Sequence, residues 1–133
     1  MNVAPVLHVD TRMSRARVEL GELGEDLACE ELVRRGYAIL ARRYRCRCGE
    51  LDIIARHRGA LVFVEVKTRR DARFGGGVGA MTALKRRRMV RLAHDYLARH
   101  GAAESACRFD VVSIMLDGAQ PMIEVFENAF GVD

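Results

Sequence analysis

Carboxylates and a lysine interrupt two strongly apolar stretches of the chain within residues 50–57 and 60–67. The carboxylates are Glu50 and Asp52 in the first stretch and Glu65 in the second, which also carries Lys67. Both stretches are rich in branched and aromatic residues, so each predicts a β-strand. Because a strand interior rarely tolerates charge without a compensating role, these four residues are the first candidates for chemistry.

The spacing of the two stretches indicates which charged residues meet. If the chain turns back at residues 58–59, Asp52 lies opposite Glu65 and Glu50 lies opposite Lys67. Directly opposed residues of antiparallel strands have Cβ atoms roughly 4.5–5.5 Å apart. Two carboxylates at this separation repel each other, and a divalent cation between them is the simplest way to keep both ionised. Because the ligands are hard oxygens, we expect Mg²⁺ or Mn²⁺ as the cofactor.

A site of this composition suits hydrolysis of a phosphodiester bond, which needs an activated water and a sink for negative charge. Asp52 and Glu65 would ligate the metal, and the backbone carbonyl of Val66 would add a third oxygen. Lys67 would orient the attacking water or neutralise phosphate charge, with Glu50 holding the lysine in place. The alternative is structural: a Glu50–Lys67 ion pair beside a protonated or solvated Asp52–Glu65 pair, without metal.

Hydrophobic periodicity and turn residues place these candidates in an α/β domain. We expect one helix from an N-cap at Ser14 to about Arg35, closed by Gly36, and another from about Thr82 to His100. Strands are expected at Tyr37–Tyr44, Glu50–His57, Ala60–Lys67, Arg108–Leu116 and Met122–Phe126. The third strand is apolar on both faces, which predicts a central position in the sheet. Residues 1–13 would be a flexible N-terminal tail and residues 14–133 a single domain.

Glu25 of the first helix lies three and seven residues before Ala28 and Leu32, so the helical repeat places it along the edge of the apolar face. From that position it could join the metal shell beside Asp52. The competing interpretation is a surface glutamate that pairs with Arg34 or Arg35 of a neighbouring turn. The spacing alone does not decide between them.

The basic residues of the chain are clustered around the acidic centre. The net charge is +4, from 22 basic and 18 acidic residues. One cluster precedes the acidic strand and another opens the second helix, where positive charge opposes the helix dipole unless a phosphate docks there. We therefore predict phosphate contacts from Arg42, Arg43, Lys85, Arg87 and Arg88. For either cluster alone, a solvated face is the simpler interpretation.

Composition argues against a membrane or secreted protein. No apolar run approaches the roughly 20 residues of a membrane-spanning helix. The N-terminal stretch lacks the basic start and apolar block of a secretory signal. We therefore expect a cytoplasmic protein.

Several motifs resemble two nested protein families. Asp52 and Glu65-Val66-Lys67, following a helical Glu25 within an αβββαβ order, resemble the PD-(D/E)xK nucleases, which include restriction-endonuclease-like enzymes and archaeal-type Holliday junction resolvases. More closely, the chain resembles the YraN-like family of uncharacterised bacterial proteins from about Arg15 to Phe130. The residues that carry this resemblance are Gly21-x-x-Gly24-Glu25, Gly36-Tyr37-x-Ile39-Leu40, Gly49-Glu50-Leu51-Asp52-Ile53-Ile54, Val62-Phe63-Val64-Glu65-Val66-Lys67-Thr68-Arg69, Phe74-Gly75, Lys85-x-x-Arg88 and Arg108-Phe109-Asp110-Val111. The resemblance implies a restriction-endonuclease-like core with a mixed central sheet flanked by helices, and a magnesium site at Asp52, Glu65 and Lys67 assisted by Glu25.

Three functions are compatible with these features. The first is a metal-dependent DNA endonuclease acting on branched or damaged DNA, with repair or recombination proteins as partners. The second is a non-catalytic nucleic-acid-binding adaptor that retains the nuclease-like fold. The third is an interaction protein whose acidic pair is merely structural. A junction-cutting enzyme would need two sites and therefore a homodimer, whereas a monomer would favour flaps, ends or single strands.

Overall fold

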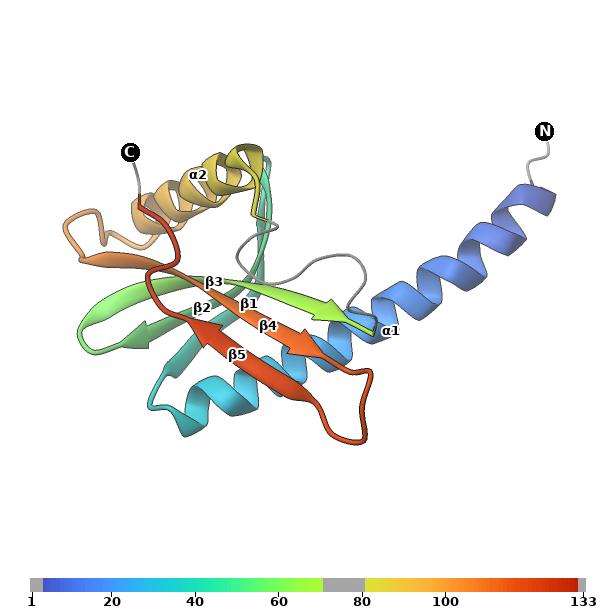
Figure 1. Ribbon diagram of the computed structural model, residues 1–133. Coiled ribbons are helices and arrows are strands. Elements are labelled where there is room, and N and C mark those ends of the chain that lie inside the picture. The colour runs from blue at the N-terminus through green and yellow to red at the C-terminus, as the bar shows by residue number, and fades with distance from the viewer. Residues whose placement is uncertain (1–3, 71–80, 132–133) are drawn as a thin grey trace.

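The computed structural model describes residues 4–70 and 81–131, with side chains from residue 15 onward. It is a five-stranded sheet with one helix against each face (Figure 1). The elements are α1 (Ala4–Arg34), β1 (Ala38–Cys46), β2 (Gly49–His57), β3 (Ala60–Arg69), α2 (Ala83–Arg99), β4 (Cys107–Met115) and β5 (Met122–Phe126). The predicted element order and α/β class are confirmed, and the arrangement is compatible with a restriction-endonuclease-like core.

The sheet is mixed, and its strand order follows the chain from β1 to β5. Neighbouring strands are antiparallel except for β3 and β4, which run parallel. Parallel neighbours need a crossover connection, and α2 supplies it. The basic first turns of α2 therefore belong to the next element in the chain after the strand that carries Glu65 and Lys67.

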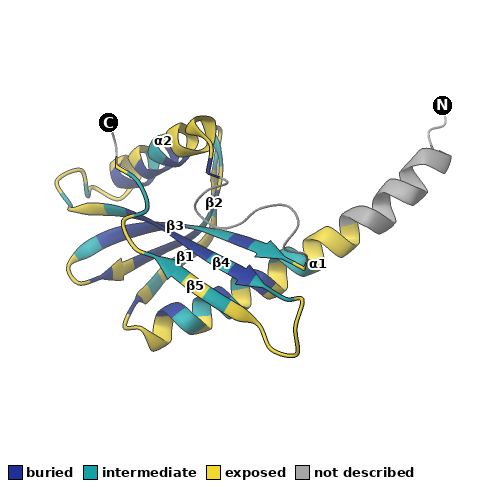
Figure 2. Ribbon diagram, viewed as in Figure 1, coloured by how far each residue is buried: buried dark blue, intermediate teal, exposed yellow. Residues whose placement is uncertain are grey.

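The core has two layers, one on each side of the sheet (Figure 2). On one side Leu92 and Tyr96 of α2 pack with Phe63 of β3, and on the other Ala28 and Leu32 of α1 pack against the opposite face. β3 supplies residues to both layers, because successive side chains of a strand point to opposite faces. The predicted central position of this strand is confirmed.

Helix α1 begins at Ala4, so the predicted N-cap at Ser14 is wrong. Pro5 is well tolerated in a first turn, and no glycine or further proline interrupts the chain before Gly21, so nothing stops the helix from extending through residues 4–13. Its N-terminal part projects beyond the sheet (Figure 1).

Among the described residues, no helix is both long enough and apolar enough to cross a membrane.

The end of α1 is set by Gly36, as predicted. Gly36 has φ +95°, a conformation that favours glycine. Its N–H donates to the carbonyl of Val33 at 3.0 Å, and the N–H of Tyr37 donates to the carbonyl of Leu32 at 2.9 Å. These two bonds form a Schellman motif, which satisfies the last carbonyls of the helix and directs the chain into β1.

The hairpin between β2 and β3 has the predicted register. His57 pairs with Ala60, and the same register continues to the pair Ile53 and Val64. The turn residues Arg58 and Gly59 have φ values of +50° and +80°. Positive φ at both central residues is the type I′ geometry, which matches the twist of a two-residue hairpin. This turn fixes which residues of β2 and β3 approach each other.

Candidate metal and phosphate site

The ladder between β2 and β3 opens at Asp52. Pairing stops after Ile53 and Val64, so the strict opposition of Asp52 with Glu65 and of Glu50 with Lys67 that the sequence predicted is not formed. Instead, the carboxylate of Asp52 accepts a hydrogen bond from the Val66 N–H, with an Oδ2–N distance of 2.7 Å. The side chain of Asp52 thus takes the place of a backbone acceptor at the point where the strands separate.

Strand β1 is also irregular at this level. Its pairing with β2 skips Arg43, which has φ +55°, a strained conformation for a residue with a side chain. Arg43 lies between two regular pairs, Arg42 with Ile53 and Tyr44 with Leu51. The backbone of β2 is therefore released from regular pairing on both sides at Asp52. Such local strain in a sheet is frequent beside functional sites.

Asp52 lines a cavity on each side of this opening. The smaller cavity, about 110 Å³, is also lined by Glu50, Glu65, Lys85 and Arg88, together with Met89 and Leu92 of α2. The larger, about 300 Å³, is formed with Val66, Thr68 and four α1 residues, Arg17, Leu20, Gly21 and Glu25. The structure thus brings together the predicted residues Asp52, Glu65, Glu25, Lys85 and Arg88.

The two central carboxyl groups are poorly solvated. Burial, and then the nearby charge of Glu65, raise the pKa of Asp52 to about 8, although the hydrogen bond from Val66 opposes this rise. Burial also raises the pKa of Glu65, against the opposing charges of Lys85 and Lys67. In both cases loss of water disfavours the charged form. The pair is therefore costly to ionise without a cation.

Lys67 is a buried residue, 9% exposed, whose charge acts on Glu65. Burial and then the charge of Lys85 lower its pKa, while Glu65 raises it. A lysine with a lowered pKa exchanges a proton more readily near neutral pH than an exposed lysine does. Its predicted partner Glu50 instead accepts a hydrogen bond from Arg45, with an Nη2–Oε2 distance of 2.8 Å. The expected Glu50–Lys67 contact is thus replaced, because Glu50 faces its β1 neighbour.

Glu25 and the two arginines of β1 form a network that the sequence did not predict. Arg43 Nε donates to Glu25 at 2.9 Å, and Arg42 donates to Asp26 at 2.8 Å and to Glu25 at 3.4 Å. The alternative pairing of Glu25 with Arg34 or Arg35 is wrong, because both of those arginines bond Glu31. The predicted phosphate contacts of Arg42 and Arg43 stay a prediction, and these α1 carboxylates would compete for them.

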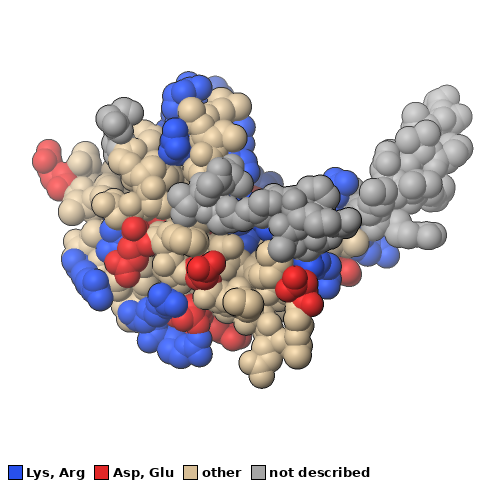
Figure 3. Space-filling view, viewed as in Figure 1, with Lys and Arg blue, Asp and Glu red and all other residues tan. Residues whose placement is uncertain are grey.

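The predicted basic residues of α2 differ from those of β1. Within the described parts of the chain, Lys85, Arg87 and Arg88 form no ion pair with a carboxylate within hydrogen-bonding distance. Lys85 and Arg88 face the acidic cavity, whereas Arg87 lines a different one. Figure 3 shows Lys and Arg side chains over α2, as well as others at the opposite end of the view. Two of the three α2 candidates therefore lie beside Asp52 and Glu65.

The donor set fits a hard divalent cation that keeps part of its hydration shell. Among the residues that the structure describes, no group of three His, Cys, Asp or Glu side chains is arranged to hold a metal. Asp52 and Glu65 are the two carboxylates at the opening, and Val66 supplies backbone beside them. Two carboxylates and a carbonyl leave room for waters and a phosphate oxygen, as is usual for Mg²⁺ sites.

Two glycines that position this site were not recognised as such in the sequence. A Cβ atom at Gly24 would collide with Oγ1 of Thr68, so a glycine is what allows α1 to approach β3 and bring Glu25 to the opening. Gly49 has φ +134°, and a Cβ there would lie 3.1 Å from Cδ of Arg88. The spacing of Gly21 and Gly24 ahead of Glu25 was the available signal.

Replacing Gly24 with alanine should therefore destabilise the protein by about 1–3 kcal/mol, because the helix would have to move away from Thr68. Gly21→Ala is the matched control, since no atom lies within 4 Å of a Cβ at Gly21. In the control the better helix propensity of alanine should raise stability by up to about 1 kcal/mol. Urea unfolding of both variants measures the difference, and equal effects would show that the close approach is absent.

Comparisons with known proteins identify relatives along most of the chain. The model of the Uncharacterised protein family UPF0102 matches residues 24–114. A UPF0102 protein of Ralstonia pickettii is 49% identical over 117 residues, covering 85% of this chain and 90% of the relative. One from Symbiobacterium thermophilum is 55% identical over 95 residues, covering 71% and 80%, and one from Geobacter metallireducens is 44% identical over 118 residues, covering 89% and 97%. The family match includes β1, β2, β3, α2 and the part of α1 that carries Glu25, and therefore contains Asp52 and Glu65.

Proposed function

The chain belongs to the UPF0102 family, and for this member we propose metal-dependent hydrolysis of phosphodiester bonds in DNA at the Asp52–Glu65 pair. The observation that carries the proposal is the opening of the sheet at Asp52. There two carboxyl groups with raised pKa values lie beside Lys67, whose pKa is lowered. Two buried acids at one point do not stabilise a sheet. Binding of a ligand that compensates the free energy of burying them is therefore the simplest explanation.

Asp52, Glu65 and the Val66 carbonyl would hold Mg²⁺ or Mn²⁺, and Glu25 would complete the outer coordination shell. When bound, the cation supplies Lewis-acid stabilisation of the negative charge that develops on the phosphate. The hydrogen bond from the Val66 N–H fixes one oxygen of Asp52 and leaves its other oxygen for ligation. This second contact orients a ligand carboxylate and limits its motion.

Lys67 would hold or release a proton at its Nζ atom as the attacking water loses its own. Its lowered pKa brings that exchange closer to neutral pH, because both burial and the neighbouring Lys85 disfavour the charged form. Lys85 and Arg88 would bind the phosphate oxygens from the α2 side of the cavity. The role of α2 in this proposal is to supply positive charge that the protein itself does not neutralise.

Branched or damaged DNA in the cytoplasm is the substrate class we propose, with DNA repair or recombination proteins as partners. The basic residues of α2 fit the sugar-phosphate backbone, which a nuclease contacts whatever the base sequence. Action on four-way junctions would require two copies of the site and therefore a homodimer.

The test is cleavage of labelled linear, flapped, single-stranded and four-way DNA by the purified protein with Mg²⁺ or Mn²⁺. Glu65→Gln prepared in parallel controls for contaminating nucleases, because it keeps the size of the side chain and removes its charge. We expect cleavage that requires metal and disappears in the variant. If both proteins bind DNA and neither cleaves any substrate, the nuclease proposal fails and the adaptor function replaces it.

A further inference from the structure

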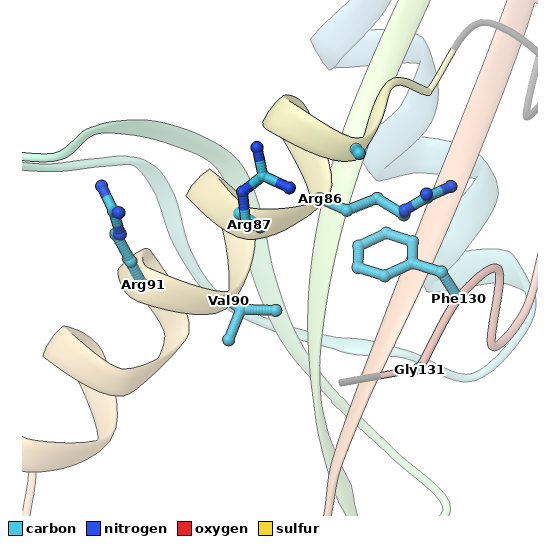
Figure 4. A pocket seen from close by; sticks show the side chains of 7 residues that line it. Arg86, Arg87, Val90, Arg91, Phe130 and Gly131 are labelled. Atoms are coloured by element: carbon cyan, nitrogen blue, oxygen red, sulfur yellow. The ribbon is translucent and has the colours of Figure 1, made fainter. Parts of the chain in front are cut away.

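A second cavity lies beside α2, apart from the acidic one. Its volume is about 610 Å³, which is within the range of small-ligand sites. The lining residues are Ala83, Arg86, Arg87, Val90, Arg91, Phe130 and Gly131 (Figure 4). None of these is acidic. At 100° per residue, Arg86 and Val90 lie on the flank of α2 opposite to Lys85 and Arg88.

The three arginines of this cavity are not neutralised by the protein. Within the part of the chain that the structure describes, Arg86, Arg87 and Arg91 form no ion pair, and all three are exposed. The arginines of β1 contrast with them, since Arg42 and Arg43 are both bonded to α1 carboxylates. Three unpaired guanidinium groups on neighbouring turns of one helix favour an anionic ligand with more than one phosphate oxygen to bind.

Phe130 gives the cavity an aromatic wall that is fixed in place. Its ring stacks on Phe109 with centroids 4.9 Å apart and an angle of 17° between the planes. Phe109 is buried in the core, so the stack anchors the C-terminal segment to β4. Figure 4 shows Arg86 and Val90 on the helix side of the cavity and Phe130 facing them. A rigid aromatic ring beside arginines is the combination that binds unpaired nucleotides.

We infer that this cavity binds an unpaired nucleotide of a DNA strand, with its base against Phe130 and its phosphates on Arg86, Arg87 and Arg91. The inference rests on the proposed function for its choice of DNA as ligand. A base within a duplex is already stacked and paired, so it cannot use the Phe130 ring without leaving the helix. The cavity therefore distinguishes single-stranded from double-stranded DNA.

The position of the cavity indicates a substrate class for the acidic site. The two cavities lie on opposite flanks of the same turns of α2, and an α-helix with its side chains is about 10–12 Å across. A strand that crosses α2 would thus reach the acidic cavity within a few nucleotides of the Phe130 cavity. We conclude that the substrate carries a single-stranded segment next to the cut, as a flap or an overhanging end does.

The experiment measures DNA binding in EDTA, so that no cleavage can occur. Fluorescence anisotropy compares a labelled oligothymidine with a labelled hairpin duplex for the wild type, Phe130→Leu and Arg56→Gln. Leucine keeps an apolar contact with Phe109 but removes the aromatic face, and Arg56 is an exposed arginine on β2 outside the cavity. We expect Phe130→Leu to bind the single strand about tenfold more weakly, the effect of losing one base stack. Its duplex affinity and both affinities of Arg56→Gln should stay within about twofold.

A second variant separates charge from stacking. Arg86→Gln with Arg91→Gln should weaken single-strand binding and reduce its salt dependence by about one unit of slope per lost contact. Unchanged single-strand affinity in Phe130→Leu, or an equal loss for single strand and duplex, would overturn the inference. Because metal is absent throughout, selective loss in Phe130→Leu supports this cavity even if the cleavage assay shows no nuclease activity.

Discussion

Replacing Asp52 with asparagine should make the metal-free protein more stable near pH 8, by about 1–4 kcal/mol. Asparagine keeps an oxygen for the Val66 N–H and removes the buried charge. The pKa of Asp52 is raised from 3.8 to about 8 by burial and by Glu65. The folded protein therefore binds a proton more tightly than the unfolded chain does, and the wild type loses stability as pH rises between these values.

The difference between the two proteins should accordingly be small near pH 4 and reach its full size at about pH 8. Urea unfolding in EDTA across this range measures it. Added Mg²⁺ should stabilise the wild type, by about 2.7 kcal/mol at a hundred times its dissociation constant, and leave Asp52→Asn unchanged. Glu50→Gln is the matched control, because Glu50 is exposed and its ion pair with Arg45 is worth at most about 1 kcal/mol.

An Asp52→Asn protein that is no more stable than the wild type at pH 8 would contradict the burial of two acids at the opening. A variant that gains stability and loses cleavage together would indicate that the acidic pair lowers the stability of the metal-free protein because it is needed to bind the ligand. That combination separates a functional site from a structural one, since a purely structural pair has no activity to lose.

Replacing Asp110 with alanine should destabilise the protein by about 3–5 kcal/mol, the largest loss that we expect from any single substitution. Asp110 is fully buried and accepts hydrogen bonds from Tyr37 Oη at 2.6 Å, from the Asn128 N–H at 2.9 Å and from two nitrogens of Arg108 at 2.9 Å each. Alanine would leave the Arg108 guanidinium, whose side chain is 15% exposed, with only the more distant Glu127 carboxylate, 4.0 Å away, as a counter-ion. This network joins β4, the start of β1 and the segment after β5.

Thermal and urea unfolding measure this loss against Asp26→Ala. Asp26 pairs with Arg42 but is 59% exposed, so its removal should cost less than about 1 kcal/mol. Tyr37→Phe removes one donor to Asp110 and should cost about 1 kcal/mol, which keeps the prediction measurable if Asp110→Ala does not fold. Similar small losses in all three variants would show that the Arg108–Asp110 pair is dispensable.

Local signals in the sequence were sufficient for most of the fold. The apolar residues on both faces of β3 predicted a central strand, and the two-residue turn at Arg58 and Gly59 set the register of the hairpin. The convergence of Asp52 and Glu65 followed from that register. Each of these features depends on residues close together in the chain, so periodicity and turn chemistry are enough to predict them.

Features that depend on distant residues were not predictable in the same way. The opening at Asp52 is accompanied by the positive φ of Arg43 in the neighbouring strand, which no residue type dictates. The pairing of Glu25 with Arg42 and Arg43 joins α1 to β1 and exists only after those elements pack. The error at Ser14 had another cause: a residue that favours helix N-caps is also tolerated within a helix when no breaker is nearby.

The irregular course of β1 bears on the solubility of the protein as well as on its chemistry. β1 is an edge strand of the sheet, and a flat, unpaired edge invites pairing with another chain and aggregation. The register shift between Ile39 and Ala41, the positive φ of Arg43 and the charged side chains of Arg42 and Arg45 all make this edge a poor template for another strand. The distortion that frees Asp52 from the ladder therefore also protects the sheet from edge-to-edge association.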